Sequence, residues 1–163
     1  MHARGRLTLL ATLIVPALTP ACSKGESKPS SEPAASAEPA APSGGQAKYE
    51  DPAFELVMRP ASEFVAGKPG VVEIQVEARG GYHMNDTYPY RFKTAASDGV
   101  KFGAPVFEKS AMQLEAARGT MKVDVTPESA GAKSVSGMFH FSVCSADRCL
   151  VEKRELKLPL AVN

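Results

Sequence analysis

Two cysteines lie five positions apart near the end of the chain, within FSVCSADRCLVEKRELKLPL at residues 141–160. Cys144 and Cys149 at this spacing could form a disulfide that exchanges with other thiols, a disulfide that only stabilises the fold, or part of a metal site. A third cysteine, Cys22, lies near the start of the chain. The compartment of the protein and the elements that hold the pair decide among these roles.

The first residues, MHARGRLTLLATLIVPALTPAC, follow the order of a secretory signal. Arg4 and Arg6 precede an apolar run at 7–18, and small residues come after it. The run has about a dozen apolar residues, whereas a membrane-spanning helix needs ~20. We therefore expect a signal peptide at residues 1–21 and a mature protein outside the cytoplasm, where disulfides persist.

Cys22 ends the stretch LTPAC, which resembles the lipobox of bacterial lipoproteins, although Thr19 stands where an aliphatic residue is usual. Lipidation of Cys22 would anchor the protein to a bacterial membrane, facing the periplasm, and Ser23 favours the outer membrane under the usual sorting rule. Cleavage by an ordinary signal peptidase after Ala21 would instead leave a free thiol. We expect lipidation, because the segment that follows Cys22 has the composition of a tether. Lipidation also leaves one cysteine pair and no odd thiol.

Residues 22–48 are dominated by Pro, Ser, Ala, Gly and Glu, and they contain no aliphatic or aromatic side chain larger than Ala. Such a segment cannot bury enough apolar surface to offset its ordering entropy, so we expect a disordered tether. Residues 49–163 have the length of one domain. The chain has 19 basic and 18 acidic residues, a net charge of +1 and no basic stripe, so we expect no nucleic-acid partner.

Apolar and polar residues alternate along the domain with a period of two, which is typical of half-buried strands. Turn signals rich in glycine or proline separate these segments at 67–70, 78–81, 97–99 and 127–133. We predict an all-β fold, an immunoglobulin-like antiparallel β-sandwich of about seven strands. EKSAMQLEAARG, at 108–119, is predicted to be a helical turn or a long loop. The alternating segments are FELVMR, VVEIQVEA, TYPYRFKT, TMKVDVT, GMFHFSV and the C-terminal LKLPLAV.

The cysteine pair is expected at a hairpin turn. A strand over 138–144 places its two phenylalanines and Val143 towards the core, so that His140 and Cys144, with the serine between them, point the other way. The sequence SADR then reverses the chain and brings Cys149 opposite Cys144. The two Cα atoms should lie roughly 4.5–5.5 Å apart, which suits a disulfide at an exposed loop tip.

Physical arguments alone leave the redox and structural roles evenly balanced. Closing a ring of about six residues stabilises a fold by only ~2 kcal/mol, and the hairpin already holds the two strands together. Solvent access and the neighbouring Arg148, which could favour a Cys149 thiolate, both suit thiol-disulfide exchange. Many secreted domains nevertheless carry disulfides that are inert.

Two stretches resemble the N-terminal periplasmic domain of the DsbD family of thiol-disulfide interchange proteins, namely residues 141–160 and GYHMNDTYPYRFK at 81–93. The similarity covers most of residues 50–163 and implies an immunoglobulin-like fold. It also implies that Cys149 forms a mixed disulfide with a partner protein and that Cys144 resolves it. The implied partners are thioredoxin-like proteins, one of which donates electrons that pass on to extracytoplasmic acceptors.

The sequence departs from this family in three respects, one of which is that Val151 and Glu152 stand where the family often has a proline shortly after the second cysteine. DsbD proteins continue into a membrane domain and a thioredoxin-like domain, whereas this sequence ends at Asn163, so we expect the electron donor to be a separate protein. The family shields its cysteines with a cap loop that bears an aromatic residue. The corresponding segment here, VFEKSAMQLEA at 106–116, offers Phe107 or Met112 for that position.

The histidines allow two interpretations. His140 shares a strand face with Cys144 and could influence a thiolate, but an exposed strand histidine without a role is the simpler interpretation. His83 is expected to order a turn or loop. Together with Met84, Met138 and Cys144, these histidines would offer soft ligands to copper. Their spacing fits no metal motif, and we expect neither a metal nor another cofactor.

Three classes of function therefore remain. The first is a membrane-anchored thiol-disulfide oxidoreductase component that acts through Cys144 and Cys149, with His140 and Arg148 as modulators. The alternative is a noncatalytic immunoglobulin-like binding or assembly lipoprotein with a structural disulfide. The third is copper handling. No hydrolase motif such as GxSxG occurs in the sequence.

Overall fold

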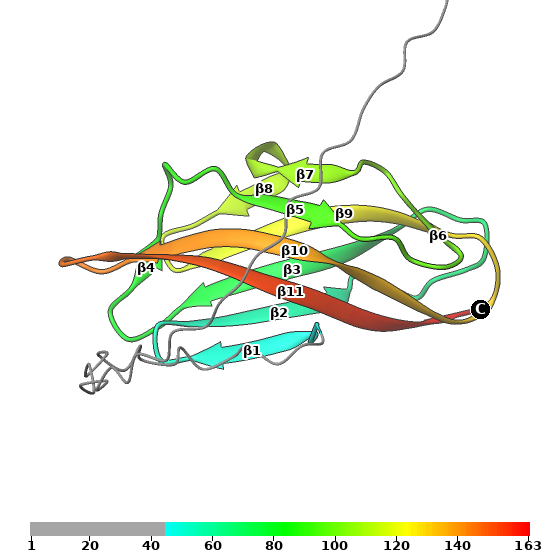
Figure 1. Ribbon diagram of the computed structural model, residues 1–163, viewed down its shortest axis with the longest axis horizontal. Helices are drawn as coiled ribbons and strands as arrows, with labels where there is room; N and C mark the ends of the chain where they lie inside the picture. The colour runs from blue at the N-terminus through cyan, green and yellow to red at the C-terminus, as the bar shows by residue number, and fades with distance from the viewer. Residues whose placement is uncertain (1–44) are drawn as a thin grey trace, which may run out of the picture. The chain divides into compact units, whose positions relative to one another are not determined.

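The computed structural model describes residues 45–163, and this part of the chain is mostly β-strand. Two antiparallel sheets pack face to face as an immunoglobulin-like β-sandwich (Figure 1), so the predicted fold class is confirmed. The predicted signal peptide, Cys22 and the tether as far as residue 44 lie outside the described residues. No helix within residues 45–163 has the length and apolar character needed to span a bilayer.

The larger sheet has the strand order β1–β2–β3–β9–β6, with β8 also paired to β9. Its strands are β1 (Lys48–Asp51), β2 (Phe54–Pro60), β3 (Gly70–Ala78), β6 (Val100–Phe102), β8 (Met112–Leu114) and β9 (Arg118–Pro127). The smaller sheet has the order β11–β10–β5–β7, with β4 also paired to β10. Its strands are β4 (His83–Met84), β5 (Arg91–Thr94), β7 (Val106–Glu108), β10 (Gly131–Cys144) and β11 (Cys149–Val162).

The period-two pattern places one set of side chains between the sheets. In β3, Val72, Ile74 and Val76 are completely buried, whereas the polar residues between them are half-buried. In β11, every second residue from Leu156 to Val162 is buried in the same way. Burying an aliphatic side chain of this size contributes about 1.5–3 kcal/mol, so these alternating rows hold the two sheets together.

The described residues form eleven strands rather than the seven or so expected, because four of them have only two or three residues and are too short for a period-two pattern to reveal. The segment TYPYRFKT is another difference, since its strand begins only at Arg91 and Tyr88 lies in the preceding turn. The uncertain segment 108–119 forms a 3-10 turn, η1 (Lys109–Ala111), then the short strand β8 and a turn into β9.

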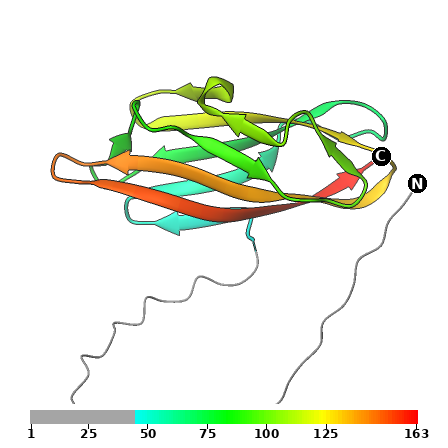
Figure 2. The same cartoon turned by 45° about the horizontal axis from the view of Figure 1, so that its top comes forward.

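β10 and β11 form a long hairpin, with 14 residues in each strand. They stay in register from Gly131 opposite Val162 to Cys144 opposite Cys149. In two views the turn of this hairpin projects beyond the ends of the neighbouring strands, at the left of the molecule (Figures 1 and 2). The fold therefore presents the cysteine pair at one end of the sandwich.

Candidate functional site

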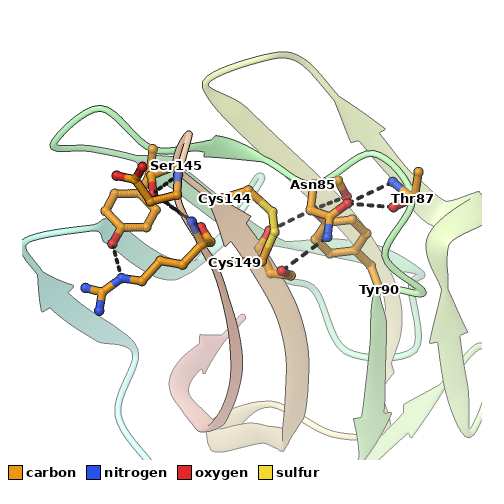
Figure 3. Close-up of a disulfide and its surroundings, with 10 residues drawn as sticks. Asn85, Thr87, Tyr90, Cys144, Ser145 and Cys149 are labelled. Carbon is orange, nitrogen blue, oxygen red and sulfur yellow. Dashed lines mark hydrogen bonds between the residues drawn. A yellow bond between two sulfur atoms is a disulfide. The ribbon is translucent and has the colours of Figure 1, made fainter.

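Cys144 and Cys149 form a disulfide across the end of the hairpin (Figure 3). The main-chain N–H of Ser145 donates to the carbonyl oxygen of Arg148 at 2.8 Å, so these two residues form the hydrogen-bonded pair next to the turn. The cysteines are then a non-hydrogen-bonded pair, in which facing Cα atoms approach most closely. Their Cα atoms lie 4.0 Å apart, nearer than the expected range. The predicted pairing across SADR is confirmed.

The turn is closed by the side chain of Ser145. Its hydroxyl oxygen accepts hydrogen bonds from the main-chain N–H groups of Asp147 and Arg148, each at 3.3 Å, and the hydroxyl lies 3.3 Å from the Arg148 carbonyl oxygen. A serine at the first position of a four-residue turn commonly makes such bonds to the main chain. The four residues between the cysteines therefore have a defined geometry of their own.

The two cysteines differ in exposure. Cys149 is exposed, whereas Cys144 is only 7% exposed. The expectation that the whole disulfide would be exposed is therefore wrong for Cys144, and Ser142, expected on the same outward face, is also completely buried. Here β10 pairs with β4 on one edge and β11 on the other, with His83 opposite Cys144, and the side chain of Asn85, which follows β4, contacts the Ser142 hydroxyl.

A hydrogen-bonded network holds the loop after β4 against β10 next to the disulfide (Figure 3). The side-chain amide of Asn85 donates to the Ser142 hydroxyl at 3.4 Å, and Asn85 Oδ1 accepts from the N–H and hydroxyl of Thr87. The Tyr90 hydroxyl lies 2.7 Å from the Asn85 carbonyl oxygen and 3.0 Å from that of Ser142. Sequence reasoning missed this network, although Asn-x-Thr is a recognisable turn signal.

Burial raises the pKa of Tyr90 to about 12. The phenol therefore stays protonated at physiological pH and remains a donor to the two carbonyl oxygens. Its ring packs edge-on against Tyr88, with centroids 5.3 Å apart. Tyr90 thus anchors the loop that contacts Ser142.

Arg148, the predicted modulator of Cys149, lies in the turn and is exposed. Its Nε–H donates to the hydroxyl of Tyr82 at 3.1 Å, which ties the hairpin turn to the residue that precedes β4. The guanidinium thus has a structural contact in the oxidised protein. Arg148 remains adjacent to Cys149 in the chain, and its effect on a thiolate stays a prediction.

His140, the other predicted modulator, lies away from the disulfide. It is four residues from Cys144 along β10, which corresponds to roughly 13 Å at about 3.3 Å per residue. Burial, followed by the positive charges of Arg91 and Lys153, lowers the pKa of His140. Both cations lie on neighbouring strands, directly opposite the histidine. A neutral imidazole at this distance has little influence on a thiolate.

The soft ligands considered for copper do not converge in the structure. His83 is exposed in β4, Met84 is buried in the core, and Met138 lies six residues from Cys144 along β10. The Cys144 sulfur itself is bonded to Cys149. Residues 45–163 contain no group of three histidine, cysteine, aspartate or glutamate residues that could hold a metal ion.

The two candidates for a cap residue both lie in the core. Phe107 in β7 is 7% exposed and faces Phe92 of β5, while Met112 in β8 is 9% exposed and faces Met121 of β9. β7 belongs to the same sheet as the long hairpin, whereas β8 belongs to the larger sheet, and neither strand pairs with the hairpin. The expected position of a cap residue is therefore not filled by Phe107 or Met112, because each is used in packing.

Comparison with known proteins shows no family for this chain. No family model matches the sequence, and no curated protein matches it either. Among solved structures, a cohesin module from a family 33 glycoside hydrolase of Clostridium perfringens is 12% identical with a TM-score of 0.40, covering 69% of this chain and 98% of that one. AggA, the major subunit of aggregative adherence fimbriae type I from Escherichia coli, is 9% identical with a TM-score of 0.32, covering 68% and 95%. No functional conclusion follows from either.

Proposed function

We propose that this protein exchanges disulfides with partner proteins through Cys144 and Cys149. The observation that carries the proposal is the unequal exposure of the two cysteines at the end of a projecting hairpin. Thiol-disulfide exchange requires a sulfur that another protein can reach and a second sulfur that leaves and later returns. Cys149 has the exposure needed for the first role, and buried Cys144 suits the second.

The exchange can be written with all bonds and electrons balanced. A partner thiolate attacks Cys149 Sγ, the bond to Cys144 breaks, and Cys144 leaves as a thiolate that takes up a proton. A second partner thiolate then attacks the partner's own sulfur in the mixed disulfide and releases Cys149. The partner's dithiol is thereby oxidised to a disulfide, and the two cysteines of this protein become thiols. Electrons pass to an acceptor by the reverse steps.

The small structural value of the bond supports this proposal. The ring closed by Cys144 and Cys149 contains about six residues, which corresponds to ~2 kcal/mol of stabilisation. The two strands are already held by fourteen register pairs, and the large apolar core lies between the sheets rather than at the tip. Opening the disulfide therefore leaves the forces that maintain the sandwich in place.

The proposed setting is extracytoplasmic. The signal peptide and the lipidated Cys22 would tether the domain to a bacterial membrane facing the periplasm, where disulfides persist. The resemblance to the N-terminal domain of DsbD makes thioredoxin-like proteins the proposed partners, both as electron donors and as acceptors. No metal or organic cofactor is needed for the exchange.

The reduction potential of the Cys144–Cys149 pair is the measurement that tests this function. The full chain with Cys22→Ser, which removes the third thiol, would be equilibrated in dithiothreitol and glutathione buffers and the two redox forms quantified. We expect a potential above about −300 mV, the value below which structural disulfides usually lie. A much lower value would make the bond a structural staple and contradict the proposal.

Trapping with a partner provides a second test. In Cys144→Ser the exposed Cys149 should form a mixed disulfide that cannot be resolved, and it should accumulate with a thioredoxin-like protein that lacks its own second cysteine. Cys149→Ser is the matched control, because it leaves a thiol that is buried. Equal trapping by the two variants would show that exposure does not assign the roles.

A noncatalytic binding or assembly module with a structural disulfide is the second candidate. It is favoured by what surrounds the disulfide: His140 is distant along the strand, and Arg148 is bonded to Tyr82. This alternative predicts that replacing both Cys144 and Cys149 by serine leaves the function of the cell intact. The exchange function predicts that the same double variant loses it.

A further inference from the structure

The outer edge of β11 begins at the exposed cysteine. Near its far end this edge is paired by other parts of the chain: Gln46 exchanges hydrogen bonds with Glu155 and Lys157, and the N–H of Asn163 donates to the carbonyl oxygen of Phe64. These contacts show that the odd-numbered residues of β11 direct their main-chain N–H and carbonyl groups away from β10. In an antiparallel pair the main-chain groups alternate in direction, so the even-numbered residues of β11 form hydrogen bonds with β10.

By the same alternation, Cys149, Val151 and Lys153 direct their main-chain groups away from β10. Within residues 45–163, no hydrogen bond to these outward groups is formed. All three residues are exposed, and Val151 is 60% exposed although it is apolar. The edge therefore presents three sets of unpaired donors and acceptors, and the first set belongs to Cys149 itself.

Side chains cover the core next to this edge, so another strand could pair with the edge while the two sheets stay packed together. The guanidinium of Arg154 lies 5.7 Å from the ring centre of Tyr49 and 5.9 Å from that of Phe54. The same guanidinium forms an ion pair with Glu152 at 2.8 Å. These side chains cover the end of the core, while the main-chain edge of β11 stays exposed to solvent.

We propose that the partner segment carrying the reactive cysteine adds to this edge as an extended antiparallel strand, with its cysteine opposite Cys149. This inference rests on the proposed exchange function and specifies how the partner is recognised. An unpaired sheet edge is the usual site for such strand addition, because the main chain of the added segment satisfies its donors and acceptors. The occupant is thus a protein segment, and Cys149 lies at the start of its binding site.

The hydrogen-bonding pattern of the edge suits a disulfide between the strands. Because the main-chain groups of Cys149 point outward, an antiparallel partner residue opposite it would form a hydrogen-bonded pair with a Cα separation of about 5.5 Å. This separation falls within the range that disulfides require. Strand addition would therefore bring the two sulfurs together without moving either main chain.

The antiparallel direction also defines the partner sequence. The residue two positions before the partner cysteine would face Val151, and the residue four positions before it would face Lys153. Apolar pairs and opposite charges across strands are favourable. We therefore expect an apolar residue at the first position and an acidic residue at the second, in the pattern acidic-x-apolar-x-Cys. Lys153 would also discourage unspecific pairing with basic segments.

Hydrogen exchange in a trapped mixed disulfide tests this inference. The probe is the capped peptide Asp-Thr-Val-Thr-Cys, joined to Cys149 in the full chain carrying Cys22→Ser and Cys144→Ser. We expect the amide hydrogens of Val151 and Lys153 to exchange about tenfold more slowly than in the same protein joined to cysteamine. The peptide Lys-Thr-Val-Thr-Cys is the charge control and should give less protection.

Two variants at Val151 test the main-chain contribution separately. Val151→Pro removes the outward N–H donor, whereas Val151→Ala removes the side chain and keeps the donor. We expect Val151→Pro to slow mixed-disulfide formation with the acidic peptide and not with cysteamine. Val151→Ala should retain most of the difference between the peptide and cysteamine.

The outcomes separate the two proposals. If neither cysteamine nor the peptide forms a mixed disulfide at Cys149, the exchange function fails. If the mixed disulfide forms and the amides of Val151 and Lys153 exchange as fast as with cysteamine, the exchange function survives and strand addition is overturned. If the same amides are protected without peptide, and more so at higher protein concentration, a second copy of this chain occupies the edge and the inference is also overturned.

Discussion

At the level of single residues, the environments of Cys144 and Cys149 differ far more than their spacing indicates. Cys144 lies between β4 and β11, and the adjoining loop is fixed by the hydroxyl of Tyr90 and the side chain of Asn85. Cys149 lies on an edge strand and is exposed. Alternation along β10 indicates which face Cys144 points to. It does not indicate that another segment covers that face.

Replacing Tyr90 by Phe should destabilise the protein, because the carbonyl oxygens of Asn85 and Ser142 would both lose a buried donor. Each oxygen keeps one main-chain donor, the N–H of Tyr88 for Asn85 and the N–H of Asn85 for Ser142, so we expect a loss of about 0.5–1.5 kcal/mol, the usual net contribution of a hydrogen bond. Urea unfolding of the oxidised protein at neutral pH measures this loss. Tyr88→Phe is the matched control, since the Tyr88 hydroxyl forms no hydrogen bond among the described residues. Similar losses in the two variants would contradict the role given to Tyr90.

Tyr90 also predicts a dependence of stability on alkaline pH. The pKa of Tyr90 rises from 10.0 to about 12 in the folded protein, so the unfolded chain releases this proton at lower pH than the folded protein does. Stability therefore falls as the pH increases from about 10 towards 12 and is unaffected by this group below that window. We expect the decrease to be smaller in Tyr90→Phe. An identical decrease in both proteins would show that Tyr90 does not titrate abnormally.

At the level of elements, the long hairpin depends on a close approach between β10 and β5. Gly137 is buried in β10 and pairs with Thr94, and a Cβ atom there would overlap the carbonyl oxygen of Lys93 and the ring of Phe92. A main-chain oxygen and a buried ring cannot move aside easily. Glycine is therefore required where the hairpin joins the rest of its sheet.

Gly137→Ala should destabilise the protein by about 1–3 kcal/mol, because overpacking displaces a strand and a core ring. Gly119→Ala is the control: its Cβ would mainly meet the ends of flexible methionine side chains, which can rearrange. We expect a smaller loss there, measured by urea unfolding of both variants. Equal losses would indicate that the β5 main chain adapts as easily as a methionine.

The sequence predicted the long hairpin better than its surroundings. The alternation around Phe139 and Phe141, followed by SADR between two cysteines, indicated the opposed pair and about half of each strand. β10 in fact begins at Gly131, inside the segment predicted as a turn at 127–133. Two-residue β4 and three-residue β7 and β8 could not be predicted, since so few residues carry no periodic signal. As a result, Phe107 was considered for a cap, whereas its strand in fact adds it to the core.

At the level of the whole sandwich, Phe64 connects the two sheets. It lies in the segment between β2 and β3 of the larger sheet and is only 2% exposed. Its main chain bridges to Val162 at the end of β11, and its carbonyl oxygen accepts from the N–H of Asn163 at 2.9 Å. Phe64 therefore connects the end of β11, in the smaller sheet, to the segment between β2 and β3 of the larger sheet.

Phe64→Ala should lower the free energy of unfolding by about 3–5 kcal/mol, the usual cost of removing a buried phenylalanine ring. Val65→Ala, at the neighbouring position with 39% exposure, should change it by no more than about 0.5 kcal/mol. Thermal or urea unfolding measures both. A loss below about 1 kcal/mol in Phe64→Ala would mean that this contact does not hold the sheets together.

The sequence by itself determined the β-rich fold class, part of each long strand and the opposition of Cys144 and Cys149, because period-two alternation and turn residues act over a few neighbouring positions. The tertiary structure decided that Cys144 is buried, that Phe107 packs in the core and that no strand among residues 45–163 pairs with the edge of β11 beside Cys149. These features depend on which strands lie side by side, and residues far apart in the chain make that choice. Alternation predicts which side chains of a strand face the core. Which strands lie next to it depends on how the two sheets assemble.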